Sequence, residues 1–164
     1  MSTGIFYARH DGTYVLKFVG DIRYPLGAPL NAFLNEMFAK ADFENAVVDL
    51  TDTTAIDSTN LGLLAKVANE LRRRGARRAT LISSNPDITE VLEGIRFDDI
   101  FHLIDRVPAA EEAMRSVEVS PFNHEDTMRV VLDAHRTLMA MNEKNKATFK
   151  SVVAAVEAEF DSDC

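Results

Sequence analysis

Cysteine is scarce in this sequence: Cys164 is the single one, and it is the last of the 164 residues. One cysteine cannot form an intramolecular disulfide, which fits a protein of the reducing cytoplasm. The ending Asp-Ser-Asp-Cys does not match a prenylation box. The first residues lack a basic region followed by an apolar run, and no stretch approaches the roughly 20 apolar residues of a membrane span. We therefore expect a soluble, cytoplasmic protein.

Basic residues are outnumbered by acidic ones. Lysine and arginine total 18, aspartate and glutamate total 26, and the formal charge is -8. Binding to nucleic acid or to anionic lipid favours a basic surface, so the composition argues against both and favours protein partners. One arginine cluster departs from this balance and is either a solvated helix end or a docking patch for an acidic partner. It consists of Arg72, Arg73, Arg74, Arg77 and Arg78.

Motifs of familiar catalytic and cofactor sites are missing. The seven glycines are scattered and form no phosphate-binding loop, and no Gly-x-Ser-x-Gly elbow occurs. Asp49 and Asp52 are three positions apart, so on a continuing strand they would face opposite ways, which argues against phosphotransfer and favours a role in organising the loop. We expect no catalytic residue, no metal and no cofactor. The four histidines also lack metal-ligand spacing: His10, His102, His124 and His135.

Short apolar runs alternate with helical patterns over the first two thirds of the chain. Strands are predicted at residues 5–9, 13–19, 46–50, 79–82 and 100–104, and helices at residues 30–38, 58–74 and around 88–92. The first two strands form a hairpin across Asp11-Gly12, and the third is continuously apolar, which suits a central position. The order predicts an α/β fold, with a mixed β-sheet that starts in an N-terminal hairpin and is packed by helices. This domain should span about residues 1–118.

The last part of the chain, residues 121–164, has a different pattern. It contains no glycine, and its apolar residues recur every three or four positions, as on one face of a helix. A polar run at residues 142–146 is the natural place for a bend. We expect a C-terminal helical extension, either one long helix or a helical hairpin. It either folds back to extend the core, or uses its apolar stripe to form a homodimer or capture a partner.

Ser58 stands where a helix should begin, after an apolar strand and a short polar loop. A hydroxyl group there lies close to free backbone N–H groups and to the positive end of the helix dipole. A phosphate added at this position could change what the surface binds without unfolding the domain. Serine is also a favoured N-cap, a role for which Asp57 competes, so a purely structural cap is the alternative.

The sequence around Ser58 resembles the signature of the STAS domain family of bacterial anti-sigma factor antagonists. The resembling segment is Asp57-Ser58-Thr59-Asn60-Leu61-Gly62-Leu63-Leu64, preceded by Val47-Val48-Asp49-Leu50. The resemblance runs from about residue 5 to residue 105 and includes Gly20-Asp21-Ile22. It departs from the family at Asn60, where a small residue is usual, and at Arg96, where glycine is common.

The resemblance implies a protein that regulates transcription by partner switching. A partner serine kinase, often itself the anti-sigma factor, would phosphorylate Ser58, and a phosphatase of the PP2C type would remove the phosphate. The unphosphorylated form would bind and sequester its partner, and the phosphorylated form would release it. The residues expected to contact the partner are Asp21, Asp57, Ser58, Thr59, Asn60 and Leu61.

Two other functions remain open at this stage. The first is a STAS subunit that is never phosphorylated and serves as a structural component of a transporter complex or a sensory assembly. The apolar stripe after residue 121 motivates it. The second is a small enzyme that uses Asp49 and Asp52. The arginine cluster alone offers weak support for nucleotide binding.

Overall fold

The computed structural model describes residues 2–105 and 113–162, so Cys164 lies outside the described residues. The strands are β1 (Gly4–His10), β2 (Thr13–Ile22), β3 (Asn45–Asp49), β4 (Thr53–Ile56), β5 (Thr80–Ile82), β6 (His102–Ile104) and β7 (Arg115–Ser116). The helices are α1 (Gly27–Phe38), α2 (Ser58–Arg73), α3 (Pro86–Gly94), α4 (His124–Met139) and α5 (Glu143–Ser162). Two 3-10 turns add η1 (Tyr24–Leu26) and η2 (Phe97–Asp99).

The strands form one mixed sheet, as the sequence predicts. Its order over the described residues is β6-β5-β3-β2-β1-β7, and β4 pairs with β2 beside this path. The β1–β2 hairpin is antiparallel, whereas β2, β3, β5 and β6 pair in parallel. The strand β3 lies in the middle of the sheet, as predicted, but its residues are not all buried: Ala46 and Val48 are buried, whereas Val47 between them is half-buried. The predicted α/β fold class is therefore confirmed.

Two short strands were not predicted from the sequence. Residues 53–56 were expected to be a polar loop, but they form β4 and pair in parallel with the end of β2, where Ile22 lies opposite Ile56. The pairing of Gly20 with Thr53 is followed by a register shift, and the Thr53 hydroxyl donates to the Phe18 carbonyl over 2.8 Å. The strand β7 contains two residues and pairs with β1. Both strands depend on partners distant in sequence, which a local pattern does not reveal.

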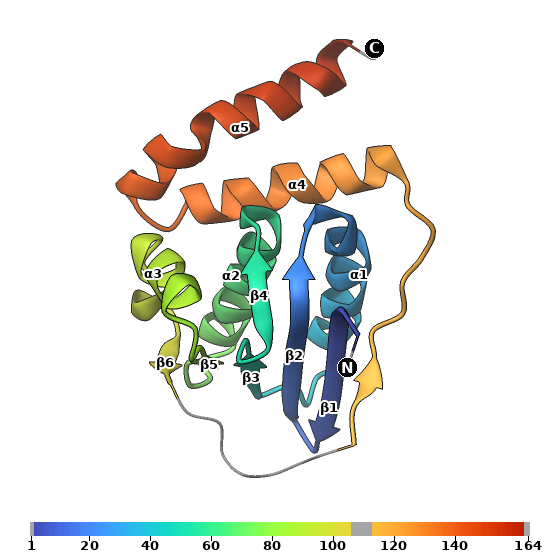
Figure 1. Cartoon of the computed structure of the whole chain (residues 1–164), viewed down its shortest axis with the longest axis vertical. Coiled ribbons are helices and arrows are strands. Elements are labelled where there is room, and N and C mark those ends of the chain that lie inside the picture. Colours follow the sequence, from blue (N-terminus) through green and yellow to red (C-terminus); the bar gives the residue numbers. More distant parts are fainter. Residues whose placement is uncertain (1, 106–112, 163–164) are drawn as a thin grey trace.

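The helices α1 and α2 lie behind the sheet in Figure 1 and supply the helical half of the core. Their apolar stripes, predicted from spacings of three and four, are buried: Leu30 and Leu34 of α1 and Leu64 and Leu71 of α2 have no exposed surface. The helix α2 ends as predicted, with Gly75 at a φ of 70° just after the C-cap Arg74.

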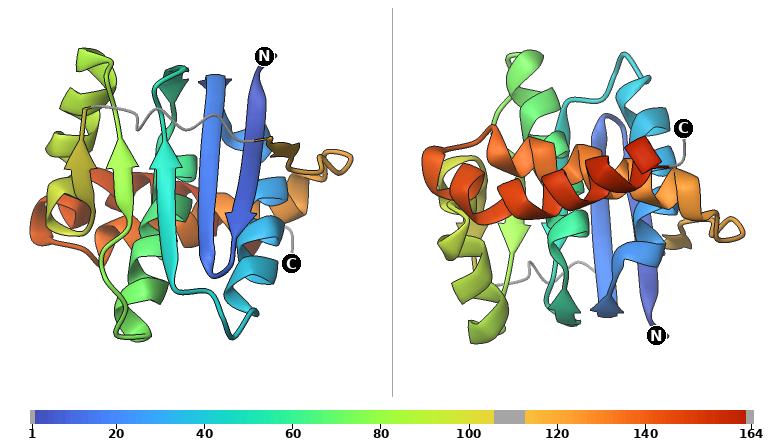
Figure 2. Two further views of the ribbon diagram at one scale, coloured as in Figure 1. Left: turned by 90° about the horizontal axis from the view of Figure 1, so that it is seen from below. Right: turned by 90° about the horizontal axis from the view of Figure 1, so that it is seen from above.

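The C-terminal segment forms a helical hairpin that folds back onto the domain. Helix α4 crosses the starts of α1 and α2, and α5 lies on the side of α4 away from the sheet (Figures 1 and 2). Helix α4 ends at Met139 and α5 begins at Glu143, so the turn lies at the beginning of the predicted polar run. The Asn142 side chain accepts a hydrogen bond from the Asn145 backbone N–H. The Asn145 amide then donates to the Ile95 carbonyl over 3.0 Å. Of the open alternatives, the hairpin that extends the core is the one observed.

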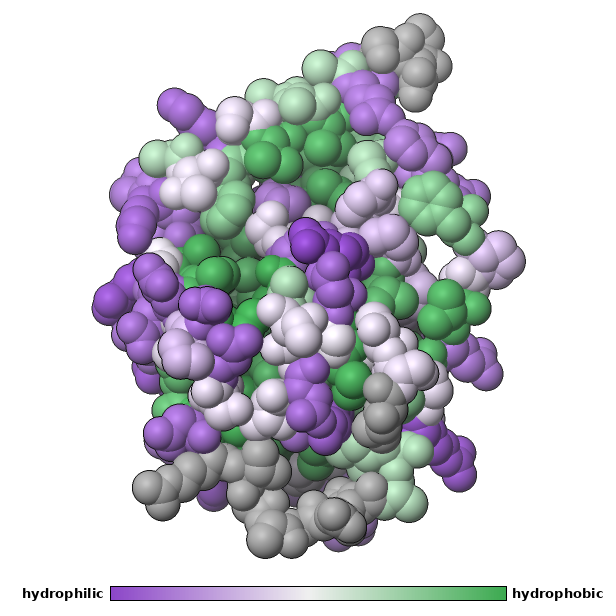
Figure 3. Space-filling view, viewed as in Figure 1, coloured by the Kyte–Doolittle hydropathy of each residue, from purple (hydrophilic) through white to green (hydrophobic). Residues whose placement is uncertain are grey.

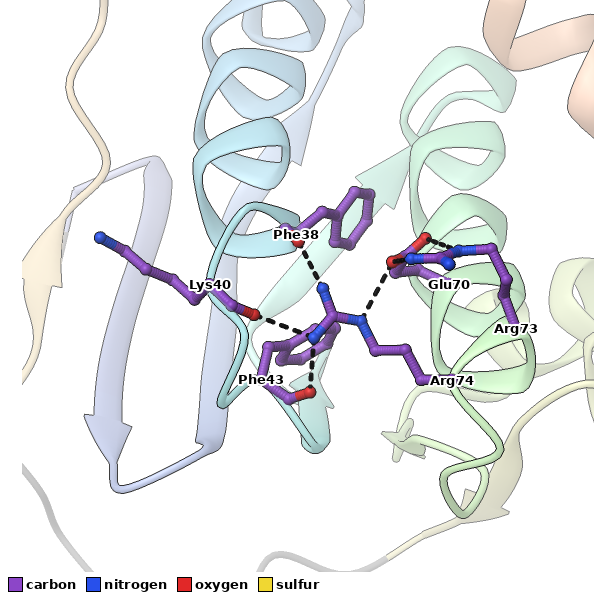
Figure 4. A network of polar contacts seen from close by, with 6 residues as sticks. All are labelled: Phe38, Lys40, Phe43, Glu70, Arg73 and Arg74. Carbon is purple, nitrogen blue, oxygen red and sulfur yellow. Dashed lines mark hydrogen bonds and ion pairs between the residues drawn. The ribbon is translucent and has the colours of Figure 1, made fainter.

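The arginine cluster at the end of α2 divides into structural and exposed members (Figure 4). The Arg74 guanidinium donates to the carbonyl oxygens of Phe38, Lys40 and Phe43, the last two over 2.9 Å. It also pairs with Glu70 at 3.0 Å and lies over the Phe43 ring. Arg73 pairs with the same Glu70 from the solvent side. The hydrogen bond from Arg73 lowers the pKa of Glu70 most; burial opposes this shift, and Arg74 adds to it. Arg74 therefore joins the end of α1 to the end of α2.

Arg96 shows why glycine is usual at its position. Its φ of 65° and ψ of 37° place it in the left-handed region, where a side chain is strained. The Arg96 guanidinium pairs with Asp99 at 3.1 Å and with Asp98 at 3.7 Å. These exposed ion pairs offset part of the strain.

Candidate functional site at the start of α2

Helix α2 begins at Ser58, and Asp57 is its N-cap. The Asp57 carboxylate accepts hydrogen bonds from the backbone N–H of Asn60 over 3.1 Å and from its side-chain amide over 2.9 Å. The Asp57 backbone N–H donates to the Ile22 carbonyl over 3.1 Å, which fixes the helix start against the end of β2. Because Asp57 does the capping, the Ser58 hydroxyl is free for another role.

The Ser58 hydroxyl contacts a buried histidine from the C-terminal hairpin. Its Oγ lies 2.6 Å from Nε2 of His135, whose side chain is 3% exposed. The other ring nitrogen, Nδ1, lies 2.6 Å from the Val131 carbonyl oxygen, which can only accept, so Nδ1 carries a proton. In the neutral ring Nε2 is then an acceptor, and Ser58 donates to it. Phe149 of α5 packs edge-on against the same ring, with centroids 5.6 Å apart.

Helices α2 and α4 are in close contact beside this pair. A Cβ atom at Gly62 would lie 2.2 Å from the Ala134 carbonyl oxygen and 2.7 Å from the Ala134 side chain, so only glycine fits there. One turn further along α2, the Lys66 ammonium group forms an ion pair with Asp133 of α4. The start of α2 is therefore in direct backbone contact with α4.

Comparison with known proteins identifies the family. The STAS domain model matches residues 7–110, more than half of the chain. The chain belongs to the STAS domain family. No curated protein sequence matches it. The matched range ends before α4 and α5, so the hairpin that covers Ser58 is an addition to the STAS domain.

Solved structures show the same fold. The anti-sigma factor antagonist SpoIIAA in its unphosphorylated form is 15% identical, with a TM-score of 0.56 over 63% of this chain and 89% of that one. The Bacillus cell fate determinant SpoIIAA in the phosphorylated form is 14% identical, with a TM-score of 0.55 over 63% and 92% of the two chains. The NMR structure of TM1081 is 20% identical, with a TM-score of 0.53 over 60% and 78%.

The predicted STAS site residues are neighbours, but they differ in exposure. Ser58 and Asp57 are half-buried, whereas Thr59, Asn60 and Leu61 are buried in the chain. Asp21 is exposed at the end of β2 and pairs with Arg23 at 2.6 Å. Their role in partner binding stays a prediction.

Asn60 is unusual among these residues. Its carboxamide is fully buried, its Nδ2 donates to Asp57, and its Oδ1 accepts no hydrogen bond from the described residues. A buried acceptor without a donor destabilises the arrangement that buries it.

Asp49 and Asp52 organise the loop before β4. The Asp49 carboxylate accepts from the Thr51 backbone N–H over 2.9 Å and from its hydroxyl over 2.6 Å. Asp52 pairs with Lys17 at 2.9 Å, and this hydrogen bond raises the pKa of Lys17 despite partial burial. The two carboxylates therefore hold separate partners.

Sequence reasoning missed two residues of the site, His135 and Gly62. His135 read as one more member of the apolar stripe after residue 121, and its position on that stripe did signal burial. Gly62 stood inside an otherwise apolar helical run, where a glycine signals a close backbone approach. No signal near either residue indicated that the two helices pack together.

Over residues 2–105 and 113–162, the structure contains no helix with the length and apolar character of a membrane span.

Proposed function

We propose that this protein is an anti-sigma factor antagonist switched by phosphorylation of Ser58. The observation that carries the proposal is the position of Ser58 as the first residue of α2 in a STAS domain, with its hydroxyl released from capping by Asp57. The unphosphorylated form binds and sequesters an anti-sigma factor or switch-protein kinase, and the phosphorylated form releases it. The domain is cytoplasmic and has no catalysis of its own; a PP2C-type phosphatase resets the switch.

Electrostatics supports this direction of the switch. A phosphate brings about two negative charges and three acceptor oxygens. Asp57 already holds a carboxylate next to Ser58, so a partner packed over both would bury like charges together. The free domain tolerates the same phosphate because it lies at the N-terminus of a helix of 16 residues.

The first prediction is that protein purified from its native cells carries a phosphate on Ser58. Peptide mass spectrometry, with and without phosphatase treatment, should locate the added mass on Ser58 and remove it. The Ser58→Ala variant should lose the modification, whereas Ser84→Ala should keep it, because Ser84 is an exposed serine near the start of α3. A kinase that labels wild type and Ser58→Ala equally would exclude the switch.

Partner capture extends the same experiment. Because it cannot accept phosphate, Ser58→Ala should retain the partner permanently in pull-downs. Ser58→Asp should release it only in part, since one carboxylate lacks the charge and geometry of a phosphate. Equal retention by wild type, Ser58→Ala and Ser58→Asp would contradict the proposed switch.

One observation favours a second function, a STAS subunit that is not phosphorylated and belongs to a transporter complex or sensory assembly. The Ser58 hydroxyl is engaged by buried His135, and hydrophobic side chains remain visible over the α4–α5 hairpin (Figure 3). Val152 of α5 and Phe122 just before α4 are among the exposed ones. A homodimer through this hairpin is part of that alternative. Stable co-purification with other subunits, unchanged by phosphatase and by Ser58→Asp, would support it.

A further inference from the structure

We propose that the start of α2 is a docking site for an amphipathic helix and that α4 occupies this site in cis. The partner of the proposed function then competes with the chain's own α4. The identity of that partner rests on the proposed function, whereas the docking site rests on the contacts between α2 and α4. Both Ser58 and the surface beside it are accessible when α4 leaves.

The contacts define the chemistry of a helix that fits. Gly62 accepts only a small residue, the place of Ala134 in α4. Lys66 pairs with a carboxylate one position before that residue, the place of Asp133. Ser58 donates to an acceptor one position after it, the place of His135.

Apolar residues four positions to either side of the small residue complete the helix face. In α4 these residues are Val130 and Leu138, and both are buried. Val130 packs beside Gly27 of α1: a Cβ atom at Gly27 would lie 3.4 Å from the Val130 side chain. A partner helix should therefore carry three consecutive residues in this order: an acidic residue, a small residue and a hydrogen-bond acceptor. Apolar residues should lie four positions before and four positions after the small residue.

The contact between α4 and α2 is one that a partner helix can replace. The Lys66–Asp133 pair leaves Asp133 exposed, so it contributes little to holding α4. While α4 fills the site, a partner can bind only to the molecules in which α4 has left. The apparent affinity of the partner is therefore reduced in proportion to that fraction. A group larger than a hydroxyl at Ser58 does not fit against α4, because the buried His135 ring already lies 2.6 Å from the Ser58 oxygen.

The test opens the site from the α4 side, in the full chain. Ala134→Leu places a large side chain against Gly62 and leaves the α2 surface unchanged. Hydrogen exchange followed by mass spectrometry should show exchange of the α4 amides roughly tenfold to a hundredfold faster, while β2 and β3 keep their protection. The matched control is Ala155→Leu, at an exposed position of α5, which should leave α4 protected.

A labelled synthetic peptide of residues 122–141 then reports on the vacated site by fluorescence anisotropy. It should bind the Ala134→Leu protein and not the wild type, whose site is filled. Gly62→Ala also expels α4 but puts a methyl group into the site, so it should bind no peptide. Adding Ser58→Glu to Ala134→Leu should weaken peptide binding about tenfold, whereas adding Ser84→Glu should not.

Two results would overturn the proposal. One is loss of protection in β2 and β3 together with α4, which would make α4 an integral part of the fold. The other is no peptide binding to Ala134→Leu at concentrations up to about 1 mM. Neither readout involves phosphate, so absence of phosphate on Ser58 in cells would remove the proposed switch and leave the docking site standing.

Discussion

Replacing Gly62 with alanine should lower the free energy of unfolding by about 2–3 kcal/mol, although alanine is the better helix former. The added Cβ would lie 2.2 Å from the Ala134 carbonyl oxygen and 2.6 Å from its carbonyl carbon. These are backbone atoms of α4, so no side-chain rotation relieves the overlap. Helix α4 must move, and the contact of His135 with Ser58 is lost with it. Urea denaturation followed by circular dichroism measures the change.

Gly94→Ala is the control for this prediction. Gly94 is the last residue of α3, and a Cβ atom there would meet nothing within 4 Å. The same substitution should therefore leave the stability unchanged or raise it by about 0.5–1 kcal/mol, through helix propensity alone. If Gly62→Ala were as stable as Gly94→Ala, α4 would not pack on α2 as described, and the covered state of Ser58 would have to be abandoned.

Much of the fold follows from local sequence signals. The β-favouring runs form β1, β2 and β3. The apolar stripes of α1 and α2 match the residues that are buried. The position of Ser58 at a helix start also follows from its neighbours. These features depend on contacts within one element, which is why a single sequence reveals them.

The parts that could not be predicted depend on residues far apart in the chain. Ser58 and His135 are separated by 77 positions, and nothing near either residue indicates the other. The strand β4 exists because it pairs with the end of β2, although its own residues look like a loop. The C-terminal stripe predicts an apolar face but not what covers it. Propensity and periodicity give the elements, and tertiary packing decides which faces meet.

Arg74 carries the second large prediction: Arg74→Ala should lower the free energy of unfolding by about 3 kcal/mol. The Arg74 side chain is 17% exposed. Its guanidinium group donates to three backbone carbonyl oxygens where α1 ends and pairs with Glu70 (Figure 4). Removing it leaves these acceptors without a charged donor and removes the packing on Phe43. Arg74→Lys should recover less than half of the loss, because one ammonium group cannot reproduce the planar fork of a guanidinium.

Arg73→Ala is the matched control, since Arg73 pairs with the same Glu70 but is 70% exposed. Exposed ion pairs contribute little to stability, so this variant should unfold at nearly the same urea concentration as wild type. If the two alanine variants lost the same stability, the shared Glu70 would account for both effects. The carbonyl contacts at the end of α1 would then contribute nothing, and Arg74 would be one more solvated member of the arginine cluster.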